Sequence, residues 1–280
     1  MNKDLLYWIP AGQYGKEGVL SLLAQHPEIR FVSLIGIDLA GNDTDEKIPI
    51  EIFMKDYDDF FAGKAVQTDG SSVVFMNIAT LNDARVDFVA DSTVNWYVDY
   101  NDENVDDATG LPVGTLRIPS FLIHNDKFID SRSILKRSCD YVAEELKKLI
   151  AGKTIKGMEN FPTGEIQDIV FTTGTELEFW VKTPSEKETV QHLSISQRLK
   201  EQYWQRMRGN VRTAMEQAIE ELDARGMHVE MGHKEVGGIK SKVEALNQKW
   251  MTAAIFLMSV NSWNWIGSFL PIRCRQQIMN

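Results

Sequence analysis

The stretch IQDIVFTTGTELEFWVKT, residues 166–183, is predicted to be a β-strand, because its β-branched and aromatic residues stand in strand register. Glu176 and Glu178 lie two positions apart in it, so a strand places both on one face, about 7 Å apart along the chain. Two carboxylates that close repel each other unless water or a cation lies between them. The hard ions Mg²⁺ and Mn²⁺ prefer carboxylate oxygen, so the pair is a candidate metal site. An exposed strand face with two solvated glutamates explains the spacing equally well.

Two further polar clusters carry candidate chemistry. In MHVEMGHKEVGG, residues 227–238, extended register places His233 and Glu235 on one face, which with the first pair gives an open, oxygen-rich metal site. A hydrogen-bonded structural histidine is the alternative for His233. In QTDGSS, residues 67–72, a tight acidic turn offers a carboxylate and hydroxyls to a cation, or is simply a turn.

Apolar periodicity along the rest of the chain predicts an α+β fold. The expected helices cover 14–25, 131–150 and 194–225, with a short amphipathic segment at 49–64 and strand-like pieces at 30–42, 85–91, 114–123 and 166–183. The acidic stretch DYNDENVDDATGLP, residues 99–112, is predicted to be a solvated connection at a domain boundary, because it lacks apolar periodicity.

Composition excludes several classes of function. A chain of 280 residues with 43% hydrophobic and 25% charged residues is expected to fold as about two domains rather than stay disordered. Its net charge of −10 argues against nucleic-acid binding, which needs a clustered excess of Lys and Arg. Two cysteines give no disulfide framework and the N-terminus has no apolar signal core, so we expect a cytoplasmic protein.

The last thirty residues differ from the rest, because 251–280 contain two arginines and no acid. Within them, 253–272 is a run without formal charge that is long enough to span a membrane as a helix. Buried asparagines, Pro271 and two mid-span tryptophans argue against insertion, so no membrane association is expected.

Taken in order, these motifs strongly resemble the glutamine synthetase family from about residue 31 to 245. The landmarks are SLIGIDLAGN (33–42), DGSS (69–72), Asp83, ADST (90–93), SRSILKR (131–137), GTELEF (174–179) and the His233-x-Glu235 pair. The resemblance implies a β-grasp domain over 1–112, a partial catalytic domain with a curved antiparallel sheet and helices over 113–250, and an aberrant tail over 251–280. It also implies a homo-oligomeric ring whose active sites lie at subunit interfaces.

The same resemblance implies a reaction. ATP phosphorylates the γ-carboxylate of L-glutamate, and ammonia then displaces the phosphate, with Mg²⁺ or Mn²⁺ neutralising the transferred group. Glu178 and Glu235 resemble ligands of one metal and Glu176 a ligand of the other. Asp69, with Ser72 beside it, resembles the aspartate that binds and deprotonates ammonium.

Glu230 and His233 are expected near the substrate or nucleotide in such a site. A γ-glutamyl ligase acting on another amine has the same metal glutamates and stays open as an alternative, although a carboxylate at Asp69 suits ammonium. A non-catalytic member that only assembles or regulates is the third possibility.

The family pattern next needs a Gly-Gln-x-Glu segment, a further His and Glu, and substrate arginines, and none follows Glu235 in recognisable form. We therefore expect the tail to be read out of frame, with catalysis impaired. DNA that encodes Trp263 to Ile266 as TGG-AAY-TGG-ATH regroups one nucleotide earlier as GAA-YTG-GAT, which encodes Glu-Leu-Asp. The same shift over Val260 to Ser262 permits Glu-Gln-Leu before it, which resembles the missing carboxylate segment.

Sequencing the gene tests this expectation directly. We expect a frame change between about codons 245 and 257, with an open frame that encodes Glu-Gln-Leu-Glu-Leu-Asp immediately after it. An intact continuous frame through codon 280, shared by close relatives of the gene, contradicts the frameshift.

Overall fold

The computed structural model describes residues 2–75, 84–157, 159–160, 166, 168–169, 171, 175–182, 209–227, 229–234 and 253–260. It divides near residue 172 into two compact units, and each is described here by itself. Asp83, Glu235 and residues 194–208 of the predicted long helix lie outside the described residues.

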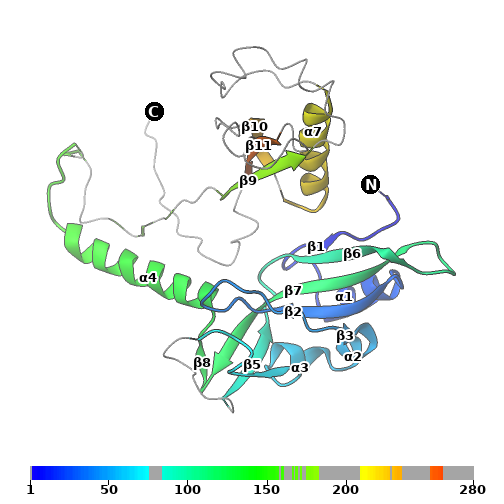
Figure 1. The fold of residues 1–280 in the computed structure, drawn as a ribbon. Coiled ribbons are helices and arrows are strands. Elements are labelled where there is room, and N and C mark those ends of the chain that lie inside the picture. The colour runs from blue at the N-terminus through cyan, green and yellow to red at the C-terminus, as the bar shows by residue number, and fades with distance from the viewer. Residues whose placement is uncertain are drawn as a thin grey trace. The chain divides into compact units, whose positions relative to one another are not determined.

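A mixed eight-stranded sheet forms the centre of the N-terminal unit (Figure 1). Its strands are β1 (Trp8–Ile9), β2 (Ile29–Ile35), β3 (Ile48–Pro49), β4 (Gln67–Asp69), β5 (Arg85–Ala90), β6 (Trp96–Val105), β7 (Pro112–His124) and β8 (Lys127–Phe128). β7 is long enough to serve two sets of neighbours: its first half pairs with β6 and, in parallel, with β2, and its second half pairs with β5 and β8. Asn125 and Asp126, both at positive φ, make the tight turn between β7 and β8.

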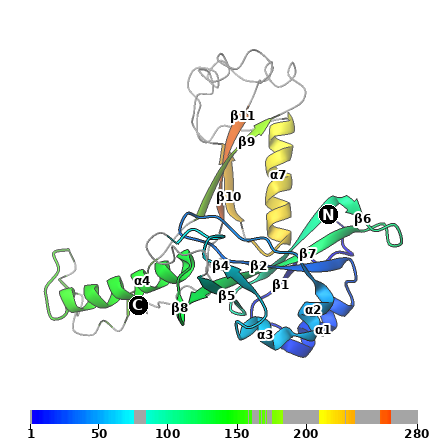
Figure 2. The ribbon, with the colours of Figure 1, turned by 60° about the horizontal axis from the view of Figure 1, so that its bottom comes forward.

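Three short helices, α1 (Lys16–Ala24), α2 (Ile50–Lys55) and α3 (Tyr57–Phe61), gather on one side of this sheet (Figure 2). They bury an aromatic core against it, in which Phe53 packs edge-to-face on Phe60 and on Trp96. Leu116 and Leu122 of β7 are fully buried in the same core. The helix predicted over 14–25 is confirmed as α1, and the amphipathic segment at 49–64 contains α2 and α3.

The acidic stretch 99–112 is largely exposed, but it is not an irregular connection. Its first seven residues are the last seven of β6, which pairs antiparallel with β7. Trp96 and Val98 are buried and Tyr100 is half-buried. Alternate side chains of the strand therefore face the core at its start, and this pattern reaches the first of the acidic residues. The predicted boundary at residue 112 therefore falls inside one sheet.

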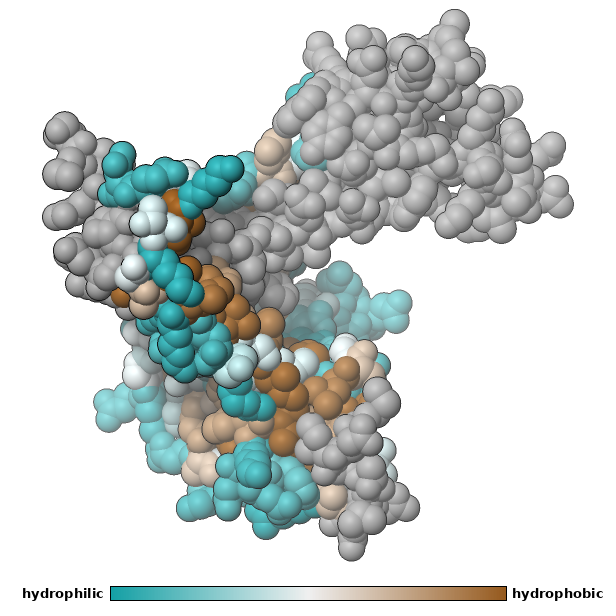
Figure 3. Space-filling view, turned by 90° about the vertical axis from the view of Figure 1, so that its left-hand side faces the viewer, coloured by the Kyte–Doolittle hydropathy of each residue, from teal (hydrophilic) through white to brown (hydrophobic). Residues whose placement is uncertain are grey.

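Helix α4 (Ser131–Ile150) has the predicted bounds, and Gly152 follows it at positive φ. Asp130 caps its N-terminus by accepting a hydrogen bond from the Ser133 N–H at 2.8 Å. The helix runs outward from the sheet, and several of its apolar side chains are exposed, among them Leu135, Tyr141 and Leu149. Figure 3, which views the molecule from the side of α4, shows hydrophobic residues at the surface between hydrophilic ones.

The C-terminal unit contains an antiparallel three-stranded sheet in the order β10-β11-β9, with one helix against it. Its elements are β9 (Thr175–Lys182), α7 (Gly209–Ala224), β10 (Val229–Lys234) and β11 (Ala253–Val260). α7 packs so closely on β10 that a Cβ on Gly232 would lie 2.9 Å from the Ile219 Cδ1 atom. The central strand β11 comes from the charge-free run of the tail. No helix among the described residues is both long and apolar enough to cross a membrane.

Candidate functional site

The Asp69–Ser72 turn follows directly from strand β4. The Asp69 carboxylate accepts a hydrogen bond from the Ser71 N–H at 2.7 Å, and the Ser72 N–H donates to the Asp69 carbonyl at 2.9 Å. Hydrogen bonds from Ser71, its side chain and then its backbone, lower the pKa of Asp69 below the usual aspartate value. The turn is confirmed, and it presents an ionised carboxylate at neutral pH beside the exposed Ser72.

The loop after β2 holds this turn and the start of α4 together. The Leu39 N–H donates to the Val74 carbonyl at 3.1 Å, two residues beyond Ser72, and the Val74 N–H donates back to the Asp38 carboxylate at 3.0 Å. On the other side, the Ser131 N–H donates to the Ile37 carbonyl at 3.0 Å. Two of the sequence landmarks, and the segment two residues beyond a third, thus meet at one loop.

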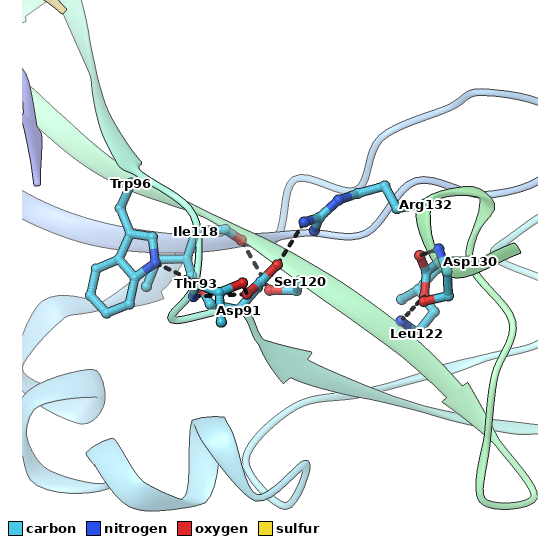
Figure 4. A network of polar contacts seen from close by, with 9 residues as sticks. Asp91, Thr93, Trp96, Ile118, Ser120, Leu122, Asp130 and Arg132 are labelled. Carbon is cyan, nitrogen blue, oxygen red and sulfur yellow. Dashed lines mark hydrogen bonds and ion pairs between the residues drawn. The ribbon is translucent and has the colours of Figure 1, made fainter. Parts of the chain in front are cut away.

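A buried ion pair joins a fourth landmark to α4 (Figure 4). The Arg132 guanidinium lies 2.6 Å from the Asp91 carboxylate, whose side chain is 1% exposed against 17% for that of Arg132. The other carboxylate oxygen of Asp91 accepts from the N–H and the hydroxyl of Thr93, at 2.9 and 2.6 Å. The Asp91 carbonyl accepts from the Trp96 indole at 2.8 Å. Both carboxylate oxygens of Asp91 and its carbonyl oxygen therefore have hydrogen-bond donors within the fold.

Arg132 and Asp130 continue this network toward the second half of β7 (Figure 4). The Arg132 guanidinium stacks over the Phe121 ring at 5.0 Å from its centroid. The fully buried Asp130 carboxylate accepts from the Leu122 N–H at 3.1 Å and from the Ser133 hydroxyl at 2.7 Å. The first turn of α4 is fixed to β7 by charge-assisted hydrogen bonds.

Sequence reasoning missed the roles of Asp38, Asp91 and Arg132, which it treated only as parts of an ordered pattern. The capping role of Asp130 carries a local signal, an aspartate directly before a helical run. The partner of Asp91 is 41 residues away and that of Asp38 is 36 residues away, and no local pattern marks either pairing.

In the C-terminal unit, strand register decides which candidate residues share a face. Glu178 pairs with Leu257 of the central strand, and Leu257 pairs in turn with His233. Residues directly opposite each other in antiparallel strands lie on the same face, so Glu178 and His233 share one. Glu176, two positions along β9, lies on that face too. The two outer strands are two interstrand spacings apart, about 9.5 Å.

The remaining candidates are placed less completely. His233 is buried at 6% exposure, and Glu230 is exposed beside an irregularity in the β10 register. Glu235 lies outside the described residues, so its convergence with Glu176 and Glu178 stays a prediction. Among the side chains that the structure describes, no three His, Cys, Asp or Glu residues come together as a metal site.

No protein-family model and no curated protein matches this chain. Among solved structures, the cryo-EM structure of Plasmodium falciparum glutamine synthetase matches 90% of this chain over 45% of its own, with a TM-score of 0.48 and 15% identity. The GmaS/ADP complex in its first conformation matches 86% of this chain over 43% of its own, with a TM-score of 0.43 and 13% identity. This chain spans less than half the length of either protein, and both TM-scores lie below 0.5.

We expect Arg132→Ala to destabilise the N-terminal unit strongly. The substitution leaves the Asp91 carboxylate buried without its cation, a loss on the order of 3 kcal/mol. Lys136→Ala is the matched control, because the Lys136–Asp140 pair on the same helix is about half exposed and contributes under about 1 kcal/mol. Urea unfolding of both variants measures the difference, and equal midpoints for the two contradict the assigned role of the buried pair.

Proposed function

We propose that this chain belongs to an ATP-dependent ligase of the glutamine synthetase type. The reaction joins ammonia to the γ-carboxylate of L-glutamate through γ-glutamyl phosphate. The observation that carries the proposal is the register of the C-terminal sheet, in which Glu176, Glu178 and His233 share one face. The ordered sequence landmarks support it, since hydrogen bonds and an ion pair link three of them, and the segment just after a fourth, within the N-terminal unit.

The donor set fits a hard divalent ion. Glu178 with Glu235 would hold one Mg²⁺ or Mn²⁺ ion, and Glu176 the other, since both metals favour carboxylate oxygen. When bound, such ions neutralise charge on a phosphoryl group in transfer. His233, on this face, and Glu230, at the register irregularity of β10, would lie near the substrate or the nucleotide.

Asp69 fits the capture of ammonium better than its deprotonation. Its lowered pKa keeps the carboxylate ionised at neutral pH, where it attracts a cation. The same lowered pKa makes it a weak proton acceptor. We infer that Asp69, with Ser72 beside it, concentrates ammonium, which passes one proton to solvent before its nitrogen lone pair attacks the γ-glutamyl phosphate. This favours ammonia over a bulkier amine, although a γ-glutamyl ligase for another amine uses the same metal glutamates.

The proposed assembly is a cytoplasmic homo-oligomeric ring, in which one subunit's Asp69 turn faces its neighbour's metal site. Substrate arginines and the last metal carboxylates of the family are not recognisable after Glu235. Catalysis by charge neutralisation depends on a complete site, so this chain is expected to bind metal but turn over poorly.

Metal affinity tests the ligand set independently of turnover. We expect Glu178→Ala to weaken Mn²⁺ binding to the full chain at least about tenfold, equivalent to about 1.4 kcal/mol, and Glu235→Ala to do the same. Glu216→Ala is the control, because Glu216 is half exposed on α7 and is paired with Arg212. Titration calorimetry measures all three, and unchanged binding in the first two variants means that the ligands are wrong.

A frame-restored chain tests the reaction itself. We expect a version in which one nucleotide is corrected, so that Glu-Gln-Leu-Glu-Leu-Asp is encoded, to form γ-glutamyl hydroxamate from glutamate, ATP and hydroxylamine with Mg²⁺ or Mn²⁺. The present chain should be slower by about 10²-fold or more, as expected when charge stabilisation is lost. Inactivity of the restored chain despite metal binding favours a non-catalytic assembly role, and equal activity of the two chains contradicts the inferred impairment.

A further inference from the structure

Asp38 is a buried carboxylate that the proposed reaction does not use. It follows β2 in the loop 36–44 and is 3% exposed. It accepts four hydrogen bonds at 2.9–3.0 Å: from the N–H groups of Ala40 and Asn42 on one oxygen, and from the Asn42 side-chain amide and the Val74 N–H on the other.

Three of these four donors close the loop itself. Gly41 completes the turn at φ +86, where its N–H donates to the Asp38 carbonyl, and the Asp38 N–H donates to the Asn42 carbonyl. The fourth donor, Val74, is 36 residues away and belongs to the segment that continues the Asp69–Ser72 turn. Of the four hydrogen bonds, only the one from Val74 connects the Asp38 carboxylate to another segment of the chain.

The Val74 contact fixes one end of the Asp69–Ser72 turn. The other end is held by the antiparallel pairing of β4 with β5 and by the Gly70 N–H, which donates to the Ala84 carbonyl at 2.7 Å. At Val74 the link runs both ways, because its carbonyl also accepts from Leu39. The turn is thus held between the sheet and the Asp38 loop.

We propose that Asp38 is a positioning residue for the Asp69–Ser72 turn, acting through the Val74 amide. Its part in ammonia capture rests on the proposed function, whereas the contact itself does not. Ile37, next to Asp38, accepts from Ser131 at the start of α4, so the same loop ties the turn to the helix.

A carboxylate is required at this position because four donors converge on it. Burial raises the pKa of Asp38, but the hydrogen bonds from Asn42, Val74 and Ala40 outweigh burial and leave the pKa below the usual aspartate value. An asparagine has one acceptor oxygen, and its NH2 group can only donate, so it can accept hydrogen bonds from only one of the two pairs of donors. If it keeps the loop turn through Ala40, its amide nitrogen faces the Val74 N–H and the contact is lost.

Hydrogen exchange on the full chain tests this directly. We expect Asp38→Asn to speed exchange of the Val74 amide by about tenfold or more, as for a lost hydrogen bond to a charged group, with smaller changes across 70–73 and none in α1. Asn42→Ala is the matched control: it removes another donor to the same oxygen but leaves the Val74 bond, and Val74 exchange should stay within about twofold. Unchanged exchange at Val74 in Asp38→Asn, or equal acceleration in both variants, overturns the proposal.

A measurement on the unmodified chain covers the case in which Asp38→Asn does not fold. The amide proton shift of Val74 should titrate with the Asp38 carboxyl, at a pH below the usual aspartate value of 3.8. A Val74 amide shift that is independent of pH while the chain is folded overturns the contact.

Kinetics of the frame-restored chain then separate positioning from folding. Displacement of the Asp69 turn should raise the KM for ammonium, measured by phosphate release, about tenfold in Asp38→Asn while the KM for ATP stays constant. A purely structural defect lowers the active fraction and leaves both KM values unchanged, which contradicts the positioning role. If Asp38→Asn alters Val74 exchange but the frame-restored parent chain has no turnover, the proposed function is contradicted and the Asp38 contact is supported.

Discussion

Hydrogen bonds to buried carboxylates hold the loops of the N-terminal unit in place. Asp38, Asp91 and Asp130 are 3%, 2% and 0% exposed, and each accepts from a segment that lies elsewhere on the sheet or helix. Burying a charge is costly unless every lone pair finds a donor, so each carboxylate restricts the local backbone to arrangements that supply those donors. The sheet provides the apolar core, and these three residues determine where its connections run.

The three carboxylates use different kinds of donor. Asp130 is served by backbone and hydroxyl groups at a helix start, and Asp38 by backbone amides and an asparagine. Asp91 alone takes an arginine, and that guanidinium is itself covered by the Phe121 ring. An ion pair with an aromatic cover is the most sensitive of the three to substitution, because removing the cation leaves an uncompensated charge in the interior.

Sequence reasoning predicts the parts of this chain whose information is local. The bounds of α4 follow from its periodicity and its glycine stop, and the common face of Glu176 and Glu178 follows from strand alternation alone. The acidic end of β6 resembles a loop in composition, because the pairing partner that makes it a strand lies in β7. The contacts of Asp38 and Asp91 could not be predicted either, since their partners are 36 and 41 residues away and only the folded sheet brings them close.

Strand order in the C-terminal sheet would limit the geometry of the proposed metal site. Leu257 of the central strand pairs with Glu178 on one side and with His233 on the other. Two positions along the same strand, Ser259 pairs with Glu176. Oxygen and nitrogen donors on the shared face therefore come chiefly from the outer strands, about 9.5 Å apart. A hard divalent ion takes six or more oxygen ligands, so an ion held from β9 would complete its shell with water unless the central strand supplied a carboxylate. In the proposed site, a carboxylate on the middle strand would therefore help to close the shell of the ion that Glu178 binds.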